Sequence, residues 1–252
     1  LFACGKENVF QFPPSGIDYD DSFFSASDLG KPGRRYVGLY IPNLSYATAS
    51  IRLYSRLLWT PATWDLENDE DRDPYWTVVG YYGTTRELGQ AATWADSDIK
   101  ERLFEYWRSA KKKKTRYLNK FTELTGRIDA PEVRKGLDSL KVSYPDRGTI
   151  DLCLATNMIS VGLDVSRLGM MVIAGQPKET SEYIQASSRV GRGEAKGIVF
   201  VMYGTQRPRD RSHYENFKNY HESFYQHVEP SSITAFCPQV RDRAMPGTLI
   251  GM

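Results

Sequence analysis

One segment of the chain, ATNMISVGLD at residues 155–164, places three groups that suit a phosphorylated ligand. The hydroxyl of Thr156 can donate to a phosphate oxygen, Gly162 permits a close approach of the backbone, and Asp164 can accept hydrogen bonds from sugar hydroxyls. A strand that ends at Ala155 would deliver Thr156 to the carboxyl edge of a sheet, where open α/β folds bind ligands. A capped turn with a glycine at its end explains the same residues equally well, so this segment alone decides nothing.

A second segment, QASSRVGRG at residues 185–193, holds two arginines on a turn punctuated by glycines. Arg189 and Arg192 are three positions apart, so a continuing helix projects them from nearly the same side, and Gly191 and Gly193 permit a tight turn. A guanidinium is always charged and its fork matches phosphoryl oxygens. Arginines inserted from a second domain stabilise the charge of a transferred phosphoryl group. The alternative is a basic helix end that satisfies its own dipole, and this segment alone favours that alternative.

Short apolar runs between helical segments predict the sheet that positions both segments. Such alternation is typical of a parallel sheet with both faces covered. We therefore predict a three-layer α/β domain with a mostly parallel central sheet and helices on both faces. The predicted strands are residues 36–41, 76–82, 150–155, 170–174 and 198–203.

Helix start signals and polar runs predict the segments between the strands. A helix is expected to begin near Asp98, and another after Asp129, with Pro131 in its first turn. A last amphipathic helix is expected over about residues 212–227, and residues 65–73 are expected to form a solvated acidic loop.

Composition excludes several classes of protein. The 33 Lys and Arg nearly balance 31 Asp and Glu, so any attraction of a polyanion must be local. Three cysteines without CxxC spacing disfavour a disulfide framework or a zinc ribbon. No apolar run approaches the roughly 20 residues that span a bilayer. We expect a cytoplasmic protein without a membrane partner and without a bound structural metal.

The chain is expected to divide into a connecting arm at residues 1–34, one domain at residues 35–205 and a helical C-terminal extension at residues 206–252. It begins at Leu1 and ends in an apolar run, so we interpret it as a fragment.

Together, the two chemistry-bearing segments resemble motifs V and VI of superfamily 2 helicases, whose second RecA-like domain carries ATxxxxxGLD and then QxxxRxGRG. The strand and helix start WTVVGYYGTTREL at residues 76–88 resembles motif IV. The resemblance is strong over residues 150–193 and weaker over residues 76–203. More narrowly, the sequence of residues 160–192 is similar to that of the bacterial helicase of the DISARM phage-defence type.

This resemblance implies a nucleotide-facing set of residues. Gly162 and Asp164 would face the nucleotide phosphates and ribose, and Gln185 would link the γ-phosphate region to the partner domain. Arg189 and Arg192 would be the arginine fingers.

The resemblance also implies a nucleic-acid-facing set. Thr156 would contact the nucleic-acid backbone, and Thr84 or Thr85, at the helix start after the motif IV strand, would bind a strand phosphate. Two departures leave details open, because many relatives have Asp where this chain has Asn157 and Gly where it has Ser188.

A P-loop, GxxxxGK[ST], is not found in the sequence, since Gly5-Lys6 is followed by Glu7. The resemblance therefore implies that ATP with Mg²⁺ is bound mainly by a first RecA-like domain, and that this chain alone turns over no ATP. The expected function is the second motor domain of an ATP-dependent helicase or translocase. The expected partners are DNA, or RNA instead, the first RecA-like domain, and subunits of a defence complex. The alternative is a catalytically silent scaffold or partner-binding module in a defence or repair complex.

For three further features, a structural interpretation is favoured over a functional one. His213 and His221 can share a helix face, but a metal site there is disfavoured. The basic run at residues 111–114 is interpreted as a helix end or a mobile loop rather than a phosphate contact. Arginines in the RPRDR segment at residues 207–211 are able to touch DNA, but a solvated turn is the favoured interpretation.

Overall fold

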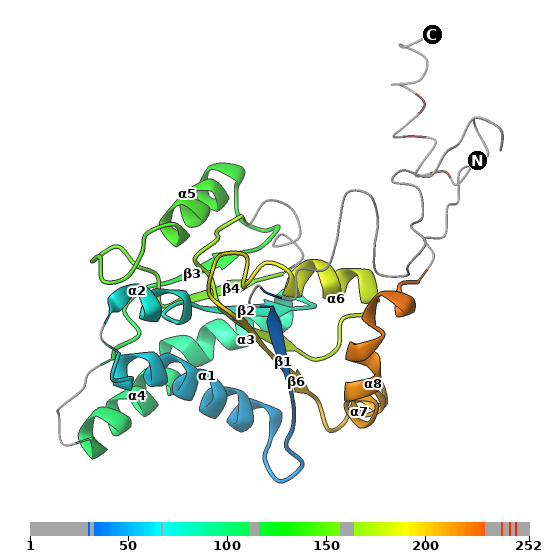
Figure 1. The fold of residues 1–252 in the computed structure, drawn as a ribbon, viewed down its shortest axis with the longest axis horizontal. Helices are drawn as coiled ribbons and strands as arrows, with labels where there is room; N and C mark the ends of the chain where they lie inside the picture. The colour runs from blue at the N-terminus through cyan, green and yellow to red at the C-terminus, as the bar shows by residue number, and fades with distance from the viewer. Residues whose placement is uncertain are drawn as a thin grey trace.

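A computed structural model describes residues 30, 33–66, 68–110, 116–156 and 164–229, together with the single residues 238, 242 and 245. Its centre is a six-stranded sheet with the order β1-β6-β5-β2-β4-β3, in which every pairing is parallel (Figure 1). The predicted parallel sheet is confirmed, with one strand, β3, that the sequence analysis did not name. The strands are β1 Arg34–Tyr40, β2 Val78–Tyr82, β3 Phe121–Leu124, β4 Leu152–Ala155, β5 Met170–Ala174 and β6 Gly197–Tyr203.

Helices connect the strands and cover the sheet. The long helix α1 was not named by the sequence analysis, although Ser45 caps it by accepting a hydrogen bond from the Thr48 amide at 3.1 Å. The helices of the described residues are α1 Tyr46–Thr63, α2 Asp69–Arg72, η2 Asp73–Tyr75, α3 Thr85–Asp96, α4 Asp98–Ser109, α5 Ala130–Leu140, α6 Thr180–Ser187, α7 Pro208–Glu215, α8 Phe217–Glu222 and η4 Phe224–His227.

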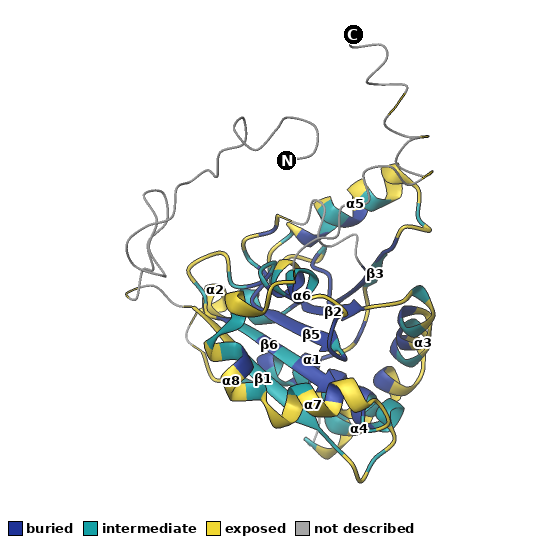
Figure 2. Cartoon of the chain, turned by 90° about the vertical axis from the view of Figure 1, so that its right-hand side faces the viewer, coloured by how far each residue is buried: buried dark blue, intermediate teal, exposed yellow. Residues whose placement is uncertain are grey.

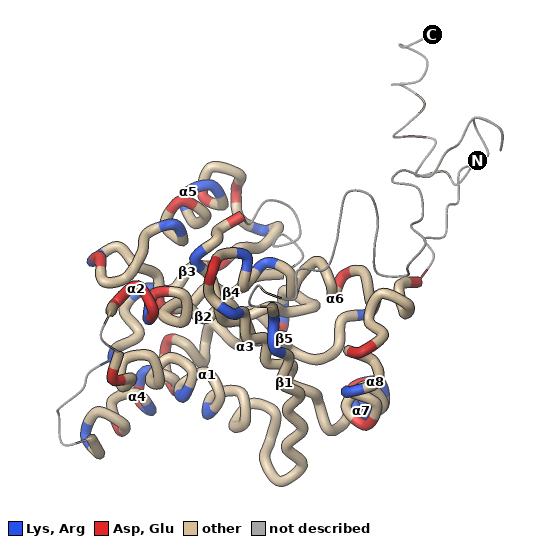
Figure 3. Tube along the Cα trace, in the orientation of Figure 1, with Lys and Arg blue, Asp and Glu red and all other residues tan. Residues whose placement is uncertain are grey.

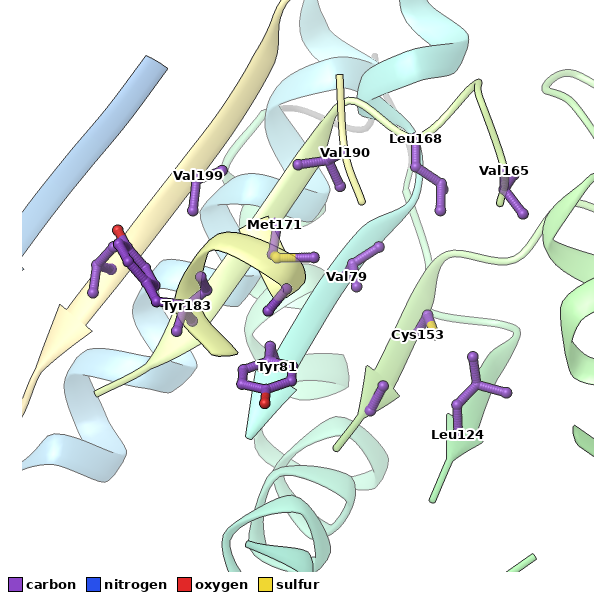
Figure 4. Close-up of a cluster of buried hydrophobic side chains, with 14 of the residues drawn as sticks. Val79, Tyr81, Leu124, Cys153, Val165, Leu168, Met171, Tyr183, Val190 and Val199 are labelled. Carbon is purple, nitrogen blue, oxygen red and sulfur yellow. The ribbon is translucent and has the colours of Figure 1, made fainter. Parts of the chain in front are cut away.

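The central strand β2 shows how the sequence builds three layers. Its five residues are all buried, and successive side chains point to opposite faces of the sheet. Val79 and Tyr81 join a core with residues of α5, α6 and α8, whereas Val78 and Tyr82 join a second core with residues of α1, α3 and α4. Figure 4 shows the first core, which contains Val79 and Tyr81 of β2 together with Tyr183 of α6. Helices therefore cover both faces, as the continuous apolar strands predicted (Figure 2).

Two predicted helix starts are confirmed. Helix α4 begins at Asp98, and α5 begins directly after Asp129 with Pro131 in its first turn. Proline at that position costs no hydrogen bond, because the first backbone amides of a helix have no acceptor within the helix.

Two other predictions were wrong. The acidic segment is not a solvated loop throughout, because it forms α2 and η2 and its Asp73 is only 7% exposed. The predicted helix over residues 212–227 is divided into α7, α8 and η4, with Asn216 and Ser223 between the pieces. The apolar periodicity was correct, since Phe217 and Phe224 pack on the first core, but it did not predict these breaks.

Helix α7 lies against β1 and β6, so residues 208–215 pack on the sheet. Within the described part of the chain, no helix has the length and apolarity to cross a membrane.

Candidate functional site

Three threonines gather at the carboxyl edge of the sheet. Thr156 directly follows β4, is 8% exposed, and donates its amide to the Leu124 carbonyl at 3.1 Å, at the end of β3. Thr84 follows β2 and caps α3 by accepting a hydrogen bond from the Glu87 amide at 3.2 Å, and Thr85 is the first residue of that helix. Because β2 and β4 are neighbouring parallel strands, their carboxyl ends place all three residues at one edge.

Arg192 and Asp164 meet although 28 positions separate them. Nη1 of Arg192 donates to Oδ1 of Asp164 at 2.8 Å, and Nε of Arg192 donates to the Ser188 carbonyl at 2.8 Å. The side chains are 32% and 81% exposed, respectively, so the pair lies at the surface. An exposed pair of this kind contributes about 0–1 kcal/mol, and an incoming anion can displace the carboxylate at little cost.

This pair lies at the amino edge of the sheet. The Gly191 amide donates to the Leu168 carbonyl at 2.8 Å, and the Ile198 amide donates to the Gly169 carbonyl at 2.8 Å. Both carbonyls directly precede β5, so the arginine turn lies beside the start of that strand.

The two ends of the segment 155–164 therefore lie at opposite edges of the sheet, with Thr156 at the carboxyl edge and Asp164 at the amino edge. The crossover between them includes Asn157 and Gly162, which lie outside the described residues. The residue types predict one phosphate-binding junction in this segment, whereas the structure separates the Thr156 hydroxyl from the Asp164 carboxylate.

Arg189 shares the electrostatic environment of the surface pair. Its pKa lies below the usual value, mainly because of burial and further because of the positive charge of Arg192, while Asp164 opposes this shift. Gln185 is exposed in the last turn of α6 and precedes Arg189 by four positions. The structure thus brings Asp164, Arg189 and Arg192 together, with Gln185 one helical turn before Arg189.

The arginine turn depends on a glycine. Gly191 has φ +66°, and a Cβ there would lie 2.6 Å from the Cα and the amide nitrogen of Gly197. No other residue fits this left-handed conformation and this backbone contact without a shift.

A supporting residue that the sequence analysis missed is Arg34, at the start of β1. Its Nε donates to the Val190 carbonyl at 2.7 Å and its Nη2 donates to the Ser188 carbonyl at 3.0 Å. The Ser188 carbonyl thus accepts from Arg34 and from Arg192, so it joins strand β1 to the arginine turn. No local signal identifies Arg34, because its partners lie more than 150 positions away.

Several aromatic residues whose rings could stack on nucleic-acid bases are engaged in packing instead. Trp59, Tyr81 and Tyr82 are at most 6% exposed. Trp76 stacks on the ring of Tyr144 with a centroid separation of 3.9 Å. The basic run at residues 111–114 lies outside the described residues.

The histidines are also engaged in packing. Nδ1 of His221 donates to the Phe217 carbonyl at 2.7 Å, which leaves Nε2 to accept from the Tyr183 hydroxyl at 2.9 Å. Within the described ranges, no group of three or more His, Cys, Asp and Glu side chains is arranged to hold a metal ion.

The RPRDR segment is solvated as expected, but it begins helix α7 instead of forming a turn, and two of its exposed arginines contact distant residues. Arg207 is ion-paired with Glu87 of α3, and Arg209 donates to the Pro177 carbonyl at 2.5 Å. Arg211 is also exposed, and it pairs with Glu215 on its own helix. Basic and acidic residues are interspersed along the described chain (Figure 3).

Comparison with known proteins agrees with this geometry. Residues 96–194 match the family of the helicase conserved C-terminal domain. A crystal structure of the DUF1998 helicase MrfA bound to DNA and AMPPNP superposes with a TM-score of 0.55 and 18% identity over 85% of this chain and 26% of that chain. MrfA bound to DNA alone superposes with a TM-score of 0.53 and 16% identity over 81% of this chain and 24% of that chain.

The strand order, the order of the motifs and the match of residues 96–194 identify a RecA-like domain of the helicase conserved C-terminal type. Over 254 aligned residues it is 43% identical to the DISARM protein DrmA of Bacillus paralicheniformis, an alignment that covers 98% of this chain. The chain spans about a fifth of that relative's length, 22%.

Proposed function

We propose that Arg189 and Arg192 are the arginine fingers of an ATP-dependent nucleic-acid motor, completing a nucleotide site whose P-loop belongs to a first RecA-like domain. The observation that carries this proposal is the 2.8 Å pair between Arg192 and Asp164. Two residues that the motif resemblance assigns to the nucleotide from separate segments meet at one exposed edge. Their weak pairing keeps the guanidinium in place until a stronger anion replaces the carboxylate.

The residues at this edge fit the phosphates and ribose of ATP. Arg192 and Arg189 supply charged N–H donors, and Asp164, 81% exposed, supplies an acceptor that suits ribose hydroxyls. Gln185 would link these residues to the partner domain, and Gly162 would let the backbone approach the phosphates. Bound ATP with Mg²⁺, held mainly by the first domain, would supply the transferable phosphoryl group. The fingers would act by stabilising negative charge as the two domains close.

The opposite edge would hold the nucleic acid. Thr156, Thr84 and Thr85 would contact the backbone of one strand, so the motor would grip phosphates without reading bases. The nucleotide-facing and nucleic-acid-facing residues would lie at opposite ends of the strands, so a movement at one end would be transmitted to the other. Closure on the nucleotide at the amino edge would shift the strand held at the carboxyl edge.

DNA is the nucleic acid that we propose, within a phage-defence assembly whose other subunits dock on the complete protein. The support is the 43% identity to a DISARM protein, together with the narrower sequence resemblance. RNA in place of DNA is an outcome that the experiment below separates.

ATP hydrolysis by the complete protein, with and without single-stranded DNA or RNA, tests the proposal. Arg192→Ala should lower the stimulated rate by about 10³-fold or more, while this chain alone should show no turnover. A matched control is Arg211→Ala, which removes an exposed arginine on α7 and should leave the rate unchanged. An unaltered stimulated rate in Arg192→Ala would remove the finger assignment. A complete protein without ATPase activity would support the silent scaffold instead.

A further inference from the structure

The carboxyl edge contains a cavity that the motif resemblance does not assign. Its volume is about 380 Å³, and it opens between the start of α3 and the loop from β5 to α6. Thr84, one of the proposed nucleic-acid contacts, lies in its wall. The lining residues that matter below are Gly83, Thr84, Glu87, Gly175, Lys178 and Arg207.

The side chain of Arg207 lies across this edge of the sheet, against the backbone of two glycines. It precedes α7, yet its Nη2 reaches Glu87 in the first turn of α3. A Cβ added at Gly175, where φ is +79°, would lie 2.9 Å from Nη1 of Arg207, and one at Gly204 would lie 3.2 Å from Cδ. The two glycines therefore leave a path in which the arginine lies across the ends of β5 and β6.

A buried carboxylate, that of Asp210, holds in place the loop from which Arg207 extends. Asp210 is 2% exposed, and its two oxygens accept from the Gln176 amide at 3.0 Å and the Gly204 amide at 2.7 Å. It thereby ties the β5–α6 loop to the β6–α7 loop that carries Arg207. A guanidinium held this way loses little freedom when it binds a ligand.

The tip of Arg207 remains accessible. Its side chain is 50% exposed and that of Glu87 is 26% exposed, so the pair is solvated and contributes little to stability. The contact with Glu87 uses Nη2, whereas a guanidinium carries five N–H donors. The second carboxylate of the wall, Glu182, is engaged by the Tyr81 hydroxyl, which donates to it at 2.5 Å.

We propose that Arg207 binds a backbone phosphate of the nucleic-acid strand in this cavity, and that Glu87 holds the arginine in place when no strand is bound. This inference rests on the proposed function, because the strand must run past Thr84. Lys178, also in the wall, adds a second positive charge beside the same phosphate. Arg207 is thus a phosphate-gripping residue at the opposite edge of the sheet from the finger arginines.

The test is the salt dependence of binding of the full chain to a fluorescently labelled single-stranded DNA of mixed sequence, by anisotropy between about 50 and 200 mM salt. Arg207→Gln should weaken binding about tenfold and reduce the slope of log K against log salt by about 0.7, the share of one phosphate on a single strand. Glu87→Gln should tighten binding, because it removes a negative charge beside the phosphate and releases the arginine. Arg211→Gln, one turn further along α7 and paired with Glu215, should leave both quantities unchanged.

The two variants of the pair separate recognition from folding. If the ion pair served only the structure, Arg207→Gln and Glu87→Gln would weaken binding alike, and the proposal would be wrong. A wild-type chain that binds DNA with a salt slope unaffected by Arg207→Gln would also overturn it, while leaving the proposed strand contacts of the threonines intact. A wild-type chain that binds no strand at all would refute the nucleic-acid edge itself, and this inference with it.

Discussion

Arg167 and Asp73 form a buried ion pair that joins segments 94 positions apart. Nη1 of Arg167 lies 2.9 Å from Oδ1 of Asp73, and the side chains are 9% and 11% exposed. Arg167 also donates to the Leu140 carbonyl at 2.8 Å and to the Thr77 hydroxyl at 2.7 Å. Since Asp164 is only three positions earlier in the chain, this pair anchors the segment that carries the Asp164 carboxylate.

Breaking this pair should be costly. Arg167→Met leaves the buried carboxylate of Asp73 without its counter-ion, so we expect the free energy of unfolding to fall by about 3–5 kcal/mol. Denaturant unfolding followed by fluorescence measures the change. Lys141→Met is the control, because it breaks an exposed pair with Asp138 whose side chains are both 62% exposed, and it should cost less than about 1 kcal/mol. Equal losses in the two variants would contradict the anchoring role.

Two glycines should respond in opposite directions to alanine. Gly191→Ala places a Cβ 2.6 Å from the backbone of Gly197 at a positive φ, so we expect a loss of more than about 2 kcal/mol in the free energy of unfolding. Gly89→Ala lies in the interior of α3 with nothing within 4 Å, and it should stabilise by about 0.5–1 kcal/mol. Thermal unfolding of both variants measures the contrast. A Gly191→Ala protein as stable as the wild type would show that the arginine turn adopts another conformation.

The packing of α8 should weaken in mild acid. Burial lowers the pKa of His221, and burial also lowers the pKa of His213. The unfolded chain, in which histidine titrates near about 6.5, therefore takes up protons before the folded chain does. Stability should be fully present above that pH and decline as the pH falls from about 7 towards 5.

Denaturant unfolding at several pH values checks this expectation. His221→Gln keeps a hydrogen-bonding group near Tyr183 but removes the titration, so its stability should decline less between about pH 7 and 5 than that of the wild type. The same decline in both proteins would show that His221 is not a source of the pH dependence.

The strands of the centre were predictable because they are buried on both faces. Residues 170–174 of β5 and most of β6 are apolar at every position, and no amphipathic helix has that pattern. Strand β3, in contrast, reads FTEL and lies at an edge of the sheet, where polar residues are tolerated. Its short mixed sequence carries no signal that distinguishes it from a loop.

The residues that suit phosphates and sugars were predictable as a set, but their separation between the carboxyl and amino edges of the sheet was not. Composition and spacing show that Thr156, Asp164, Arg189 and Arg192 suit phosphates and sugars, because those properties belong to each side chain. Their roles remain proposals, and the contacts of Arg34 and Arg207 lacked any local pattern.

The sequence by itself determined the class of the fold and the two phosphate-suited segments, since buried periodicity and side-chain chemistry are local properties. Only the tertiary structure decided that Thr156 and Asp164 lie at opposite edges of the sheet, that Arg192 meets Asp164, and that Arg207 reaches Glu87. The physical reason is that parallel strands need crossovers. Each crossover carries the chain from the carboxyl end of one strand back to the amino end of the next. Neighbours in sequence are thereby separated, and residues 28 and 120 positions apart become partners.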